Sequence, residues 1–111
     1  MESNIALERE VEVICDGLKR LFDVERLIVF GIKKCQKNNC ITDLDICVVA
    51  NVDYGKNDLL KKAYLEIDSD VPFDLFVYTP SEWESLLGKS ESFASRIARK
   101  GQVVYEKKQL P

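Results

Sequence analysis

The chain has 111 residues, of which 46% are hydrophobic and 32% are charged, with a formal net charge of −3. This balance predicts a single globular domain over residues 1–111 and excludes a disordered chain. The negative charge argues against a surface that mainly holds nucleic acid, but it allows a nucleotide that is bound through a divalent metal.

The first half of the chain predicts a helix followed by two strands. Apolar residues recur at helical spacing over residues 4–22, which predicts an amphipathic helix. Residues 26–31 are apolar and rich in branched side chains, so they predict a buried strand that ends at Gly31. Residues 33–42 are polar and predict a loop or a loose helical turn. Residues 43–50 are apolar on both faces, which indicates a central strand.

The second half continues the alternation of helices and strands. In order, it predicts a helix, a strand, two short helices and a last strand over residues 55–68, 71–78, 81–87, 90–99 and 102–105. Pro72 limits its strand to an edge of the sheet or to its first residues. Trp83 lies on an amphipathic helix and is predicted to be a core or interface residue. Together the elements predict an α/β (α+β) fold with one small mixed sheet and helices packed against it.

Three aspartates are the candidate catalytic and metal-binding residues. Asp43 and Asp45 are two apart in one strand, so their side chains share a face, and Asp74 lies within the next strand. If these strands are neighbours, the three carboxylates converge. Close carboxylates repel one another, and a divalent cation such as Mg²⁺ or Mn²⁺ would relieve that repulsion. The three therefore predict a metal site.

A structural interpretation of the same aspartates competes with the metal site. An Asp at the start of a strand is often a turn or cap residue, which applies best to Asp43. An ion pair with Lys33 or Lys34 is the strongest structural alternative. Asp74 lies in an otherwise apolar strand, and an unpaired buried charge there is unfavourable. This favours the metal site over the turn-and-ion-pair interpretation.

The aspartates and their surroundings resemble a known family. Gly31, a loop, Asp43–Asp45 and then Asp74 follow the order and spacing of the minimal nucleotidyltransferase domain of the polymerase-beta superfamily. Phe73–Pro80 is similar to the family's third-carboxylate strand and the helix start that follows it. Residues 97–106 are similar to its closing helix and strand. The resemblance thus covers nearly the whole chain.

The resemblance implies Mg²⁺- or Mn²⁺-dependent transfer of a nucleoside monophosphate to an acceptor hydroxyl. The donor would be a nucleoside triphosphate, with ATP expected, and the acceptor could lie on a partner protein. Asp43 and Asp45 would bind the metal, while Asp74 would complete the site and assist deprotonation of the acceptor. The polymerase-beta-like fold is implied as well.

The chain departs from the family at the triphosphate cradle. The family has a Gly-Ser pair after the first strand, but Gly31 is followed here by Ile32, which offers no hydroxyl. Gly31, Ile32 and Lys33 are the candidate nucleotide-binding residues. The lysines of this loop would hold phosphate electrostatically or simply be solvated.

Two other functions compete with the enzyme. Stand-alone domains of this family resemble the antitoxin half of two-component pairs whose other half is a helical HEPN-type protein, so the chain could be a partner-binding module. A structural homodimer without a ligand is the third hypothesis. Nucleic acid and membrane partners are not expected.

The N-terminus and the cysteines predict a cytoplasmic protein. No basic, apolar leader and no apolar run of membrane-spanning length are visible. The four cysteines are therefore expected to be reduced thiols. A structural zinc site would need all four cysteines or added carboxylates, and the spacing of the cysteines disfavours it.

Overall fold

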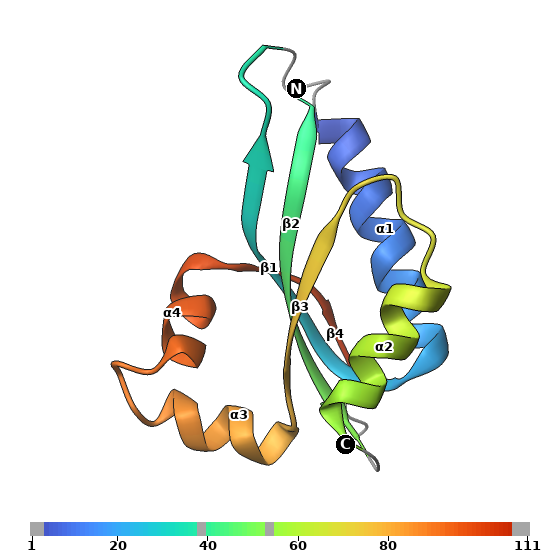
Figure 1. Ribbon diagram of the computed structural model, residues 1–111. Coiled ribbons are helices and arrows are strands. Elements are labelled where there is room, and N and C mark those ends of the chain that lie inside the picture. The colour runs from blue at the N-terminus through green and yellow to red at the C-terminus, as the bar shows by residue number, and fades with distance from the viewer. Residues whose placement is uncertain (1–3, 38–39, 53–54, 108–111) are drawn as a thin grey trace.

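The computed structural model describes residues 4–37, 40–52 and 55–107, which form four helices and four strands (Figure 1). The elements are α1 (Asn4–Leu21), β1 (Asp23–Lys34), β2 (Ile41–Asn51), α2 (Lys56–Glu66), β3 (Phe73–Tyr78), α3 (Pro80–Leu87), α4 (Phe93–Lys100) and β4 (Gln102–Glu106). The predicted order of helices and strands is confirmed. No helix in these ranges is long and apolar enough to cross a membrane.

The four strands form one mixed sheet in the order β3-β2-β1-β4. β1 is antiparallel to β2 and to β4, whereas β2 and β3 are parallel and are joined through α2. The predicted central position of the second strand is confirmed, since β2 has a neighbour on each side. β3 is an edge strand and begins at Phe73, directly after Pro72, as expected from the missing N–H of proline.

The prediction for residues 33–42 was wrong at both ends. β1 continues to Lys34 and β2 already begins at Ile41, so the two strands form a long antiparallel hairpin. The backbone N–H of Cys35 also donates to the carbonyl oxygen of Cys40 at 2.7 Å. Pairing with the neighbouring strand satisfies the backbone hydrogen-bonding groups of these polar residues. Composition alone does not show that such a segment is paired.

Helices cover both faces of the sheet, and each face has its own core. α1 and α2 lie on one side of the sheet in Figure 1, and α3 and α4 lie on the other. On the α1–α2 face, Leu44, Ile46 and Val48 of β2 join the buried cluster. On the α3–α4 face, Cys47 and Val49 of β2 pack with the other cluster. The alternation along β2 therefore divides its side chains between two cores.

α3 begins with a capping box, which fixes the helix against the sheet. The Thr79 side chain accepts from the Glu82 backbone N–H at 3.2 Å, and the Glu82 side chain accepts from the Thr79 backbone N–H at 2.9 Å. Lys56 of α2 pairs with the same carboxylate at 2.6 Å. The hydrogen bond from Lys56, followed by that from Thr79, lowers the pKa of Glu82 from its ordinary value. The next residue, Trp83, is 4% exposed, so its predicted core position is confirmed.

We predict that Thr79→Ala lowers the free energy of unfolding by about 1 kcal/mol, because the backbone N–H of Glu82 loses the hydroxyl that accepts its hydrogen bond. Thr79→Ser keeps the hydroxyl and should retain most of the stability. Urea denaturation of the two variants and the parent chain measures the difference. Equal losses in both variants would mean that the methyl group of Thr79, and not the cap, stabilises this helix start.

Candidate carboxylate site

The pairing of β2 with β3 brings two of the predicted site residues side by side. Asp45 is directly opposite Asp74 in the parallel register, and Asp43 lies two residues earlier on β2. Paired residues and residues two apart share a face, so all three carboxylates lie on the α3–α4 face. The expectation that these two strands are neighbours in the sheet is confirmed.

The expected burial of Asp74 was wrong. Asp74 is exposed, and Asp43 and Asp45 are only partly buried. β3 is an edge strand, and Figure 1 shows α3 and α4 beside the other end of the sheet, away from the hairpin. The three carboxylates therefore occupy the open end of this face, where water solvates their charge.

The three carboxylates form an open row. Among the described residues, no group of three or more His, Cys, Asp or Glu side chains is close enough to hold a metal ion. Lys33 is opposite Asp43 in the β1–β2 register. Within the described ranges, however, no ion pair or side-chain hydrogen bond involves any of the three aspartates. The structure therefore shows none of the predicted ion pairs with Lys33 or Lys34.

Gly31 lies beneath the carboxylate of Asp45. The register of β1 against β2 steps from Val29 opposite Ile46 to Gly31 opposite Asp45, which leaves Phe30 as the extra residue of a β-bulge. A Cβ atom at position 31 would lie 2.4 Å from Asp45 Oδ2 and 2.9 Å from Asp45 Cβ. The glycine is required by this close approach, and it lets the backbone of β1 meet the carboxylate.

The three predicted nucleotide-binding residues divide between the two faces. Lys33 is opposite Asp43, so it lies on the carboxylate face with Gly31. Ile32 is opposite Leu44, which belongs to the core of the α1–α2 face. Any side chain at position 32 of this strand points away from the carboxylates. The missing hydroxyl at this position is thus on the opposite side of the sheet from the aspartates.

An aromatic cluster borders the carboxylate row, and sequence reasoning missed it. The rings of Phe30, Phe76 and Phe93 have centroids 5.1 to 5.7 Å apart. Phe76 follows Asp74 by two residues on the same face, which its spacing could have revealed. Phe93 comes from the start of α4 and is 45% exposed, and only the tertiary fold brings it here.

Cys47 follows Asp45 by two residues on the same strand face, but it does not extend the site. Its side chain is fully buried beneath α3 and α4. Burial raises the pKa of the Cys47 thiol to about 12. A thiol with so high a pKa is neither a nucleophile nor a metal ligand at neutral pH.

No protein-family model, curated protein or solved structure matches this chain. The chemistry of the site therefore has to be argued from its own donors. Three carboxylates, with six oxygens, are suited to a hard cation such as Mg²⁺, which also takes waters and phosphate oxygens. Asp45 lies opposite Asp74, and Asp43 is two residues earlier on the same face of β2, so all three are candidate ligands.

We predict that Gly31→Ala destabilises the fold by about 1–3 kcal/mol, because the new methyl group overlaps the Asp45 carboxylate. Asp45→Ala removes the carboxylate, whose Oδ2 is the nearest atom, and keeps Cβ, so the double variant should lose less stability than the sum of the single losses. Thermal unfolding of the four proteins gives the coupling energy, which should be about 1 kcal/mol.

Gly88→Ala is the matched control for this cycle. A Cβ atom at Gly88 would meet only the carbonyl oxygen of Ser85 at 3.4 Å, and the backbone there has a φ of −70°. This variant should unfold at nearly the parent temperature. Additive losses for Gly31→Ala and Asp45→Ala would contradict the close approach of these two residues.

Proposed function

We propose that the chain is a metal-dependent nucleotidyltransferase that uses the carboxylate row. The supporting observation is the register of β2 with β3, which sets Asp45 beside Asp74 with Asp43 on the same face. This is the arrangement that the resemblance to minimal nucleotidyltransferases implies. Asp74 is exposed and Asp43 and Asp45 are only partly buried, so a ligand can reach these carboxylates.

Each aspartate has a separate role in the proposed reaction. Asp43 and Asp45 would hold a divalent cation, with Asp74 completing the set. Bound Mg²⁺ would neutralise phosphate charge and help align the reacting oxygens. Asp74, on the exposed edge strand, is the carboxylate most open to an incoming acceptor and would take the proton of its hydroxyl.

The proposed transfer exchanges a phosphoanhydride bond of the nucleoside triphosphate for a phosphoester bond to the acceptor. The acceptor oxygen bonds to the α-phosphorus of the nucleoside triphosphate, and the bond from that phosphorus to the bridging oxygen breaks. Pyrophosphate leaves with the electron pair. Lys33, exposed on the same face as the carboxylates, would attract the triphosphate.

ATP labelled at the α-phosphate tests the transfer, and ATP labelled at the γ-phosphate is the comparison. With Mg²⁺ and a mixture of protein, RNA and small hydroxyl acceptors, label should move only from the α-position. Asp45→Asn should lower the transfer by about a hundredfold or more, because it removes a charge that is needed in the transition state. Transfer from the γ-position would instead indicate phosphoryl transfer, and no transfer from either would contradict the proposal.

Thermal stability gives an independent readout of metal and nucleotide binding. Mg²⁺ with ATP at about a hundred times its dissociation constant should stabilise the chain by about 2.7 kcal/mol, and a chelator should reverse this. Asp45→Asn should lose the effect, whereas Asp68→Asn, an exposed aspartate outside the row, should keep it. Identical responses of both variants would place the ligand elsewhere.

A partner-binding module remains the second candidate, and the α1–α2 face favours it. Val13, Ile32 and Val104 are 37–43% exposed, and Ile32 and Val104 line a cavity of about 430 Å³ together with Val11 of α1. Exposed apolar side chains around a groove are typical of a protein-binding surface. This surface is on the opposite side of the sheet from the carboxylates.

If a helical HEPN-type partner binds this groove, we predict that variants of the groove and of the carboxylate row affect its binding differently. Ile32→Asp should abolish its binding, because a charge would be buried in an apolar contact. Asp43→Asn should leave binding intact. Isothermal titration calorimetry measures both affinities, and the reverse pattern would place the partner on the carboxylate face.

A further inference from the structure

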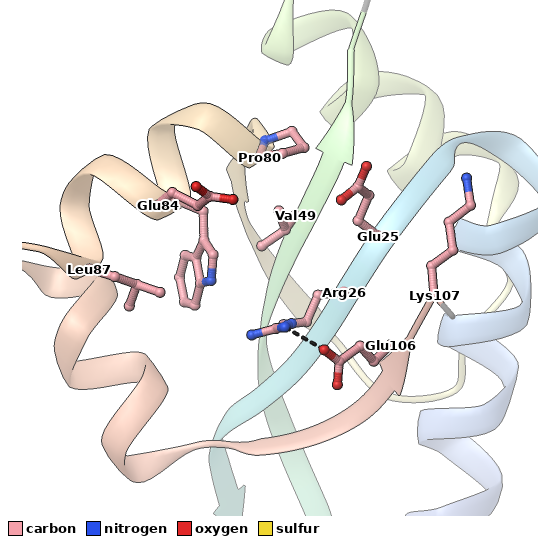
Figure 2. A pocket seen from close by; sticks show the side chains of 9 residues that line it. Glu25, Arg26, Val49, Pro80, Glu84, Leu87, Glu106 and Lys107 are labelled. Carbon is pink, nitrogen blue, oxygen red and sulfur yellow. Dashed lines mark hydrogen bonds and ion pairs between the residues drawn. The ribbon is translucent and has the colours of Figure 1, made fainter. Parts of the chain in front are cut away.

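A second cavity lies on the α3–α4 face, at the far end of the sheet from the carboxylates. It has a volume of about 760 Å³ and lies between α3 and strands β1, β2 and β4. Figure 2 shows Val49 of β2 between Glu84 of α3 and Glu25 of β1. A cavity of this size accommodates a group as large as a short peptide segment.

One wall of this cavity contains a hydrogen-bond donor without a partner. Trp83 lines the cavity and is 4% exposed, and its indole Nε1 is buried. Within the described part of the chain this is the only buried side-chain nitrogen or oxygen without a hydrogen bond. A buried unpaired N–H is unfavourable, so an acceptor that entered beside it would gain the full value of the bond.

The two cations that line the cavity each have an ion-pair partner. Arg26 is paired with Glu106 at 2.5 Å, as drawn in Figure 2, and Lys107 is paired with Asp23 at 3.1 Å. Both lining cations are therefore already committed to carboxylates of this chain.

Two lining carboxylates have no direct ion pair among the described residues, although the hydrogen bond with Asp23 and, to a lesser extent, the charge of Glu25 raise the pKa of Lys107. Glu25 accepts only from the neutral amide of Asn51, at 3.1 Å. Glu84 has no hydrogen bond or ion pair within the described residues. Between them lies the apolar side chain of Val49, with Leu87 also in the lining. The cavity thus combines excess negative charge, an apolar floor and a free donor.

We propose that this cavity binds a basic peptide segment of a partner protein. A lysine or arginine side chain lays its apolar stem along Val49 and Leu87 and brings its charge to Glu84 and Glu25. A backbone carbonyl of the same segment accepts from Trp83 Nε1. An anionic ligand would meet the two uncompensated carboxylates and is disfavoured. This binding site is independent of the proposed nucleotidyl transfer.

The single tryptophan makes the test direct, because the chain has one indole N–H and it belongs to Trp83, a residue that lines the cavity. The probe is the peptide acetyl-Ala-Leu-Lys-Leu-Ala-amide, compared with the same peptide carrying Gln or Glu in place of Lys. The indole cross-peak of the ¹⁵N-labelled protein should move downfield and saturate with the Lys peptide. The Glu peptide should leave it unchanged, and added salt should weaken the binding.

Two variants separate the charge from the hydrogen bond. Glu84→Gln should weaken binding of the Lys peptide by about tenfold, as expected for loss of one partner of a charge pair. Glu91→Gln, which removes an exposed charge between α3 and α4 and outside the cavity lining, should leave the affinity unchanged. Trp83→Phe keeps an aromatic ring, smaller than the indole, and removes the N–H, so binding followed by calorimetry should weaken by about threefold to tenfold.

Several results would overturn the proposal. Equal binding of the Lys, Gln and Glu peptides would remove the role of the carboxylates, and tighter binding of the Glu peptide would assign recognition to Arg26 and Lys107. Equal affinities of Glu84→Gln and Glu91→Gln would place the peptide elsewhere. A concentration-dependent indole shift without peptide would indicate a second copy of this chain as the occupant. An unmoved cross-peak at millimolar Lys peptide would also exclude the site.

Discussion

β2 is buried on both of its faces, and this burial sets its register with the neighbouring strands. Leu44, Ile46 and Val48 are completely buried on one face, while Cys47 is completely buried on the other. A slip of one residue would turn each set toward the wrong core. The register against β1 and β3 is therefore set by packing. Asp45 lies beside Asp74 and above Gly31 because the apolar residues that follow it allow no other alignment.

The α3–α4 face has different chemistry at its two ends. In the middle, Cys47 packs beneath α3 and α4 with Ile28, Trp83 and Ile97. Asp45 lies toward one end and Val49, the floor of the larger cavity, toward the other. Val49 is four positions after Asp45 along β2, which is about 13 Å. The helices that close the central core thereby leave two separate open surfaces, one acidic with aromatic neighbours and one with a free indole donor.

Most of the correct predictions came from the alternation of side chains along strands and from the positions of glycine and proline. The alternation predicted the shared face of Asp43 and Asp45. Pro72 limited its strand to an edge of the sheet or itself to the strand's first residues; β3 is an edge strand that begins directly after it. The polar hairpin was missed because its backbone is satisfied by strand pairing, which leaves no trace in composition. The exposure of Asp74, the bulge at Phe30 and the approach of Phe93 from α4 depend on how distant elements pack. No local pattern encodes these contacts.

Ile32 and Gly31 lie on opposite faces of the sheet, and this changes what the missing serine of the Gly-Ser pair means for the site. Judged from sequence, the lost hydroxyl weakens the triphosphate cradle. In the structure, strand alternation directs position 32 toward the α1–α2 face, so the carboxylate row meets the bare backbone of Gly31. The row also has no ion pair among the described residues, and a cation that binds there breaks none. Its binding energy would be offset mainly by dehydration of half-exposed carboxylates, a smaller cost than separating an established pair.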